Sequence, residues 1–192
     1  MPALEDAPHV HADDRATWHA WLEANHATAR GAWLVTWRSR SGRLGLDYEA
    51  AIEEALCFGW VDSTGGHFDD DRGKLYFAPR KPRSVWAASN KARVERLIGE
   101  GRMAPAGLAA IERAKANGSW EILDAVERLE VPEDLAAALE IRPPAAGNFA
   151  AFTPSARKMM LGWIALARRP ETRAARIAEI AESAARNERA RG

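Results

Sequence analysis

The segment FAPRKPRSVW, residues 77–86, places three cationic side chains between aromatic residues. Guanidinium groups beside indole rings can hold a phosphate, a carboxylate or a planar ligand, because arginine forms bidentate hydrogen bonds and stacks on aromatic faces. The earlier segment GWVD adds a carboxylate. This combination predicts a binding site in which an acid, cations and rings converge. Its predicted residues are Trp60, Asp62, Tyr76, Arg80, Lys81, Arg83 and Trp86.

A structural role is the alternative interpretation of the same residues. Residues 47–71 carry eight acids and no lysine or arginine, whereas residues 80–102 carry seven cations and two acids. Blocks of opposite charge could pair in the fold. Asp62 would then fix Arg80 or Arg83, the tryptophans would fill the core, and the cationic strip would anchor the joint between sheet and helices.

A second cationic tip, formed by Arg38, Arg40 and Arg43, lies beside Trp37. Together with residues 80–83 it could form a basic face for nucleic acid. However, the chain has no helix-turn-helix, zinc-finger or RNA-recognition signature, and its formal net charge is zero. The pattern therefore favours a solvated hairpin tip and disfavours a nucleic-acid partner.

Three weaker motifs could carry other chemistry. His67 with Asp69–Asp71 is reminiscent of a metal site but lacks the spacing of a calcium-binding loop. Ser155 and Lys158 match the S-x-x-K motif of serine β-lactamases without its companion elements. Cys57 lies on the apolar side of a predicted helix, as expected for a small buried residue. We therefore expect no metal, no cofactor and no catalytic activity.

The elements that must position these residues follow from hydrophobic periodicity. Helices are predicted from Asp13 or Asp14 to about Ala27 and after an Asp47 cap, with strands at 32–37, 59–62 and 74–78. The segment STGGHFDDDRG between the last two strands is typical of a loop. From residue 84 onward the pattern is helical. The predicted fold class is α+β, with a small antiparallel sheet and helices in the N-terminal half and a helical C-terminal half.

The bulk properties are those of an ordinary globular chain. Its 192 residues predict a flexible tail at 1–12 and a single domain at 13–192, with a soft internal boundary near 80–90. One cysteine excludes an internal disulfide and indicates a reducing compartment. The N-terminus is acidic without the apolar region of a signal peptide, and no stretch approaches membrane-spanning length. We therefore expect a cytoplasmic protein.

Five segments also carry a family resemblance. They are EALCFGWVDS (54–63), PRKPRSVW (79–86), RVERLIGEGRMAPAGLAAIERAKANGSW (93–120), VPEDLAAAL (131–139) and RRPETRAARI (168–177). In this order they resemble the YdeI/OmpD-associated family, whose members are often labelled bacteriocin-protection or OmpD-associated proteins. The resemblance covers nearly the whole chain from about Trp18 and implies protection against bacteriocins or cationic peptides, or association with a porin. It transfers no catalytic residue.

Together these observations predict a non-catalytic cytoplasmic binding or stress-protection protein. Its partner would be a small anionic or aromatic ligand, or another protein. Two alternatives stay open: a nucleic-acid-associated protein that uses both basic tips, and a hydrolase or transferase with an unrecognised site. No motif indicates the oligomeric state.

Overall fold

The computed structural model describes residues 4–190 and divides the chain into two compact units. Unit 1 comprises the residues up to Ser84 together with Ser89–Asn117. Unit 2 comprises Val85–Ala88 and the residues from Gly118 onward. The chain first passes from unit 1 to unit 2 between Ser84 and Val85. This position lies inside the 80–90 segment in which the sequence predicts an internal boundary. The single domain over residues 13–192 stays a prediction.

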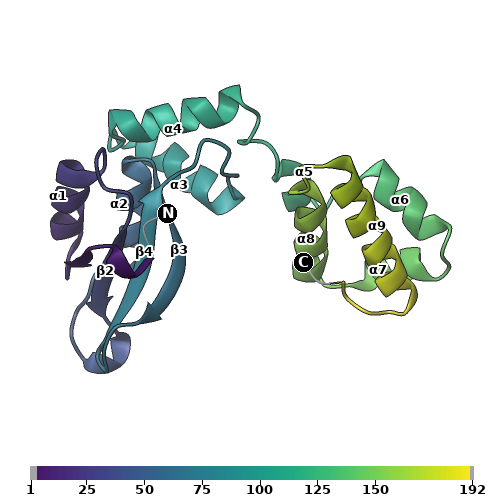
Figure 1. Ribbon diagram of the computed structural model, residues 1–192, viewed down its shortest axis with the longest axis horizontal. Helices are drawn as coiled ribbons and strands as arrows, with labels where there is room; N and C mark the ends of the chain where they lie inside the picture. Colours follow the sequence, from purple (N-terminus) through teal and green to yellow (C-terminus); the bar gives the residue numbers. More distant parts are fainter. Residues whose placement is uncertain (1–3, 191–192) are drawn as a thin grey trace. The chain divides into compact units, whose positions relative to one another are not determined.

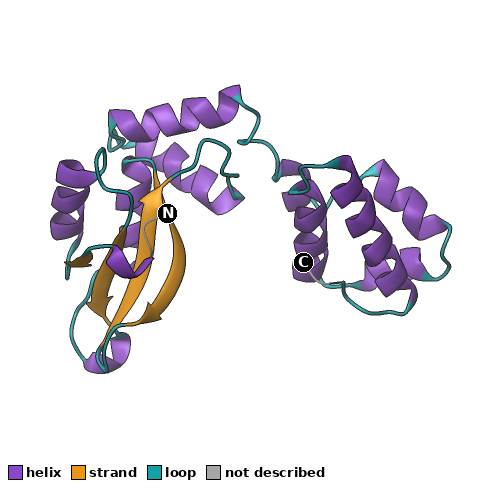
Figure 2. Cartoon of the chain, in the orientation of Figure 1, coloured by secondary structure: helices purple, strands orange, loops and turns teal. Residues whose placement is uncertain are grey.

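Unit 1 is built on a four-stranded sheet, drawn in orange in Figure 2. Its strands are β1 (His9–His11), β2 (Ala32–Trp37), β3 (Trp60–His67) and β4 (Arg72–Pro79), in the order β1-β2-β4-β3. β4 pairs antiparallel with both β2 and β3, which leaves β3 at one edge. The predicted α+β class is thereby confirmed, because the strands all lie in the N-terminal half.

The sheet is mixed rather than purely antiparallel, which corrects the sequence prediction. β1 runs parallel to β2, with His9 opposite Trp33 and His11 opposite Val35. A helix connects these two strands, and parallel neighbours need such a crossover connection. β1 also lies within residues 1–12, where the sequence predicts a flexible tail.

β3 is longer than the predicted strand of residues 59–62. Residues 63–67, which the sequence assigns to a loop, continue the strand as far as His67. Serine and glycine are weak strand formers, so pairing with β4 rather than local preference holds this part extended. A β-bulge between Asp62 and Gly65 accommodates the change of register.

The helices of unit 1 are α1 (Arg15–Asn25), α2 (Tyr48–Cys57), α3 (Ala88–Gly99) and α4 (Pro105–Ala116) (Figure 1). Short 3-10 turns span Leu4–Asp6 and Ser39–Ser41. The predicted caps are present, since Asp14 accepts a 2.8 Å hydrogen bond from the backbone N–H of Thr17, and Asp47 accepts one of 3.2 Å from Ala50. The cap at Asp47 fixes the start of α2 beside the end of the sheet.

One face of the sheet carries the core of unit 1. Trp18 of α1 is fully buried, with its ring 5.3 Å from that of Phe77 in β4. Its indole N–H donates a 3.1 Å hydrogen bond to the carbonyl oxygen of Ala51 in α2. α1, α2 and β4 therefore pack against one another around these aromatic rings.

Up to residue 190, the regular elements of unit 2 are helices, as the sequence predicts for this part of the chain. Its helices are α5 (Asp124–Glu127), α6 (Glu133–Glu140), α7 (Ala145–Ala151), α8 (Pro154–Ala165) and α9 (Pro170–Ala185) (Figure 1). The core includes the fully buried Leu135, Met160 and Ile180. Between residues 4 and 190, no helix has both the length and the apolar character needed to cross a lipid bilayer.

Candidate functional site

Three of the predicted site residues lie together where β3 begins and β4 ends: Trp60, Asp62 and Arg80. Trp60 is buried and donates from Nε1 to the carbonyl oxygen of His26 at 3.3 Å. The backbone N–H of Arg80 donates to the carbonyl of Gly59 at 3.0 Å, and its side chain is buried. Burial lowers the pKa of Arg80 to about 10, and the charge of Asp62 acts in the opposite direction. The charge of Asp62 therefore favours the protonated form of Arg80.

Tyr76 lies on the other face of the sheet. Asp62 is paired with Phe77, so the residue that precedes Phe77 along β4 points to the opposite side. The Tyr76 ring accordingly packs edge-on against Trp33, with 5.2 Å between the ring centroids.

The remaining predicted residues do not join this group within unit 1. Lys81 and Arg83 are exposed in the segment that follows β4. Trp86 belongs to unit 2, where its ring lies 4.9 Å from that of Trp120. The binding role assigned to the seven residues from the sequence stays a prediction.

The acidic and basic blocks meet elsewhere, in a charge hub around two buried carboxylates of α2. Glu53 is 6% exposed and Glu54 is 3% exposed. Arg15 of α1 donates hydrogen bonds of 2.9 Å to both, while Arg96 of α3 donates to Glu53 and Arg102 donates to Glu54 at 2.6 Å. The predicted pairing between the two charge blocks is confirmed for these residues.

The hub holds the Glu53 carboxylate ionised. Burial raises the pKa of Glu53, but hydrogen bonds from Arg96 and Arg15 outweigh it and lower the pKa from 4.5 to about 2. Burial and then the charge of Glu54 raise the pKa of the nearby Cys57 thiol to about 11. Neither group is poised near neutral pH, so this chemistry suits an ion-pair joint rather than acid–base or thiolate catalysis.

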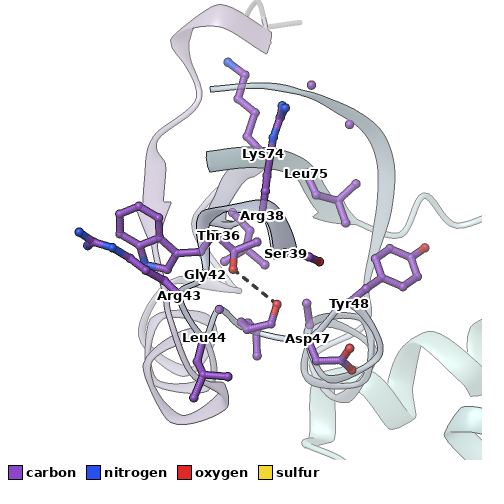
Figure 3. A pocket seen from close by; sticks show the side chains of 18 residues that line it. Thr36, Arg38, Ser39, Gly42, Arg43, Leu44, Asp47, Tyr48, Lys74 and Leu75 are labelled. Atoms are coloured by element: carbon purple, nitrogen blue, oxygen red, sulfur yellow. Dashed lines mark hydrogen bonds between the residues drawn. The ribbon is translucent and has the colours of Figure 1, made fainter. Parts of the chain in front are cut away.

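The largest cavity described lies at the opposite end of the sheet and has a volume of about 920 Å³. Its walls come from β2, the loop at residues 38–46, the first turns of α2 and the β3–β4 hairpin (Figure 3). Apolar lining residues include Leu34, Leu46 and Leu75, and Leu44 at the rim is 95% exposed. This size and apolar lining are typical of a small-molecule site.

Glycines leave room in the wall formed by the hairpin. Gly65, Gly66 and Gly73 all line the cavity. A Cβ atom added at Gly65 would have only ordinary contacts, 3.7 Å from the carbonyl oxygen of Lys74 and 4.0 Å from Cδ1 of Leu75. The strand backbone is therefore accessible from the cavity at this point.

Three cations line the cavity, and two of them are engaged with tryptophan rings. The guanidinium of Arg43 lies 4.3 Å from the centroid of the Trp37 ring, and the ammonium of Lys74 lies 4.4 Å from that of Trp33. Arg38 differs, because within residues 4–190 its half-buried side chain forms no hydrogen bond or ion pair. Arg38 is therefore the cation of this cavity that has a charge available for a ligand.

The polar groups of the first turn of α2 lie away from Arg38. In Figure 3 the Arg38 side chain extends to the end of the cavity opposite Leu44 and Asp47. Asp47 is occupied as the helix cap, and the hydroxyl of Tyr48 donates a 3.2 Å hydrogen bond to Asp62. The positive and negative ends of the cavity are thus separated.

The weaker motifs of the sequence are engaged in structural contacts. Asp69 accepts hydrogen bonds from the backbone and side chain of Arg72 in the hairpin turn, which lowers its pKa. Lys158 forms an ion pair of 2.6 Å with Glu127. Among the described residues, no three histidine, cysteine, aspartate or glutamate side chains gather so that they could hold a metal ion.

The sequence does not predict the cavity, although it shows Arg38 and Arg43 as part of a cationic tip. The loop that carries them leads into α2 and is not the tip of a hairpin. Arg40, the third cation of that tip, does not line the cavity and donates instead to the carbonyl oxygen of Asp70 at 2.6 Å. The glycines of the hairpin were the available signal, because they mark a close backbone approach.

Comparisons with known proteins divide the chain in a similar way. Residues 10–110 match a family model described as a domain of unknown function (DUF8412). Residues 128–187 match the model described as Bacteriocin-protection, YdeI or OmpD-Associated, which confirms the resemblance for that part of the chain. No curated protein and no solved structure matches the chain.

Proposed function

The chain belongs to the DUF8412 family, and on that premise we propose that it is a binding protein whose site is the cavity of unit 1. The ligand combines an anionic group with an apolar or planar part. The observation that carries this proposal is Arg38, a half-buried arginine that lines the cavity and forms no ion pair within the described residues.

The physical argument rests on desolvation. An arginine that is partly removed from water gains most from a carboxylate or phosphate, which can accept two parallel hydrogen bonds from the planar guanidinium. The leucines at positions 34, 46 and 75 line the rest of the cavity and favour an apolar or planar group beside the anion.

The same features support a role without catalysis. A hydrolase or transferase would need an acid, base or nucleophile near the ligand. The strongly shifted groups of unit 1 are Glu53, Cys57, Arg80 and Arg102, and none of these four lines the cavity. Geometry near the cavity therefore favours binding over reaction.

The cellular role that we propose is stress protection from the cytoplasm. It is supported by the description of the family that residues 128–187 match, which names bacteriocin protection. A reducing compartment is supported by the single cysteine, which is buried.

A thermal-shift screen of the full chain tests the proposed function. The panel contains nucleotides, sugar and acyl phosphates, aromatic acids and short DNA. A ligand that binds only the folded state raises the melting temperature by mass action. Gly65→Leu, which places a side chain in the cavity, should abolish the shift, while Gly147→Leu in α7, where open space surrounds the glycine, should leave it unchanged.

Two results would contradict the proposal. One is a panel in which no anionic compound stabilises the wild-type chain. The other is a shift that survives in Gly65→Leu. Stabilisation by short DNA alone, with a steep dependence on salt, would instead favour the nucleic-acid alternative.

A further inference from the structure

β3 presents an open strand edge beside the cavity. Among residues 4–190, β3 pairs with β4 alone, so its other side carries no partner strand. In natural proteins, a lysine, a proline or a bulge commonly prevents an edge strand from pairing with another chain. β3 contains no lysine or proline, and its bulge between Asp62 and Gly65 leaves Gly65–His67 as a regular segment next to the cavity.

The register identifies which backbone groups of β3 face outward. Phe68 N–H donates to the carbonyl of Arg72 at 3.2 Å, which makes this pair a hydrogen-bonded one. Bonded and non-bonded pairs alternate along an antiparallel ladder. Gly66 is therefore bonded to its partner in β4, while the N–H and C=O groups of Gly65 and His67 point away from β4.

The same register connects this edge to the cavity and to Arg38. Gly73, the partner of His67 in β4, lies beside the Arg38 side chain, because a Cβ atom added at Gly73 would be 3.4 Å from Nε of Arg38. Gly65 is paired with Leu75, whose side chain lines the cavity. Residues directly opposite one another on neighbouring strands point to the same face of a sheet. A residue added opposite Gly65 would thus direct its side chain to the face on which the cavity lies. Because Gly65 has no side chain, nothing at that position separates the added residue from the cavity.

We propose that the anionic ligand group is an acidic side chain of an extended peptide, which adds to the edge of β3 as a fifth strand. Main-chain hydrogen bonds to Gly65 and His67 supply part of the affinity, and the residue opposite Gly65 supplies the selectivity. The charge of Arg38 selects an aspartate or glutamate at that position. This inference rests on the proposed function, because it uses the same cavity and the same arginine.

The test starts with selection of random heptapeptides, displayed on phage, against the full chain. Enriched peptides are synthesised with a fluorescent label, and their affinity is measured by fluorescence anisotropy. Each is also made with its acidic residue replaced by the amide and with alternate backbone nitrogens methylated. We expect enriched peptides to share an acidic residue, and we expect one of the two methylation patterns to weaken binding about tenfold or more, because it removes hydrogen bonds to the edge.

Two variants of the chain locate the peptide. His67→Pro removes an outward N–H that makes no ladder bond and should weaken binding about tenfold, whereas His67→Ala keeps that N–H and should weaken binding much less than His67→Pro does. Arg38→Ala should weaken the acidic peptides about tenfold and leave their amide versions unaffected. A loss of affinity that occurs only for peptides with the acidic residue would identify Arg38 as the partner of that side chain.

Several outcomes would overturn the inference, and they can be told apart. If no acidic peptide is enriched, or if His67→Pro binds as His67→Ala does, β3 is not the docking edge. The proposed function still stands in that case if small anions stabilise the chain in the Gly65-dependent manner described above. Sedimentation that reveals a dimer sensitive to His67→Pro would assign the edge to a second copy of the chain instead.

Discussion

Arg102 donates a 2.6 Å hydrogen bond to Oε1 of Glu54, and Arg15 donates to the same oxygen at 2.9 Å. The two arginines come from positions far apart in the chain, and the carboxylate between them is almost fully buried. The hub therefore ties α1 and the segment after α3 to α2. Breaking a buried ion pair is costly because it leaves charge out of water without its partner.

The first prediction concerns the stability that Glu53 contributes. Its pKa is lowered from 4.5 to about 2, which corresponds to about 3 to 4 kcal/mol at about 1.4 kcal/mol per pKa unit. Glu53→Gln should lower the free energy of unfolding by about this amount at pH 7, measured by urea unfolding with tryptophan fluorescence. Glu49→Gln, which alters an exposed pair with Arg93, is the control and should have a much smaller effect. Equal losses of unfolding free energy in both variants would show that Glu53 contributes no more stability than the exposed Glu49 does.

The second prediction concerns pH. A carboxyl group whose pKa is depressed in the folded state adds stability above its unfolded pKa and loses that contribution as the pH falls toward its folded pKa. The difference in unfolding free energy between the wild type and Glu53→Gln should therefore be constant above pH 5 and shrink as the pH falls from about 4.5 to about 2. Urea titrations at several pH values would measure it. A difference that stays constant down to pH 2 would refute the assigned shift.

The third prediction concerns the contact between α4 and the end of α2. A Cβ atom at Gly107 would lie 2.2 Å from the carbonyl oxygen of Cys57 and 2.7 Å from Cε of Met103. Gly107→Ala should therefore destabilise the chain by about 2 kcal/mol, because α4 has to move away from α2. Gly99→Ala, at a glycine in open space, should leave stability unchanged or slightly raised. Thermal unfolding of the two variants would decide, and a tolerated alanine at 107 would count against this packing.

The fourth prediction concerns Cys57. Its thiol is buried and its pKa is raised to about 11, so almost no thiolate forms at neutral pH. We expect no alkylation of the native chain by iodoacetamide at pH 7.5 over an hour, and complete alkylation in urea. Intact-mass spectrometry would measure both. Rapid alkylation of the native chain would reopen the hypothesis of a thiol nucleophile.

Much of the fold could be predicted because its signals are local. The strand Ala32–Trp37 occupies the segment predicted for it, and Asp47 caps α2 as its spacing from the helix suggests. By contrast, β1 has only three residues, and the end of β3 consists of weak strand formers. Both exist because a neighbouring strand pairs with them, which periodicity along one segment does not reveal.

The candidate site divides in a similar way. Charge blocks are visible in composition, so their pairing could be predicted even though the particular partners, such as Arg96 with Glu53, could not. The cavity depends on four segments that converge only in three dimensions. Alternation along β4 could have placed Tyr76 on the opposite face from Asp62, since its neighbour Phe77 is a buried core residue.

The most direct test of the central claim compares two arginines from the same loop. Arg38 lines the cavity, whereas Arg40 is exposed and lies outside it. Isothermal titration should be carried out with the anionic compound that stabilises the wild-type chain most strongly, on the wild type, Arg38→Ala and Arg40→Ala. We predict that Arg38→Ala weakens binding at least tenfold and that Arg40→Ala binds as the wild type does. Equal weakening in both variants would mean that general positive charge attracts the ligand, and unchanged binding in Arg38→Ala would contradict the assignment of the cavity as the site.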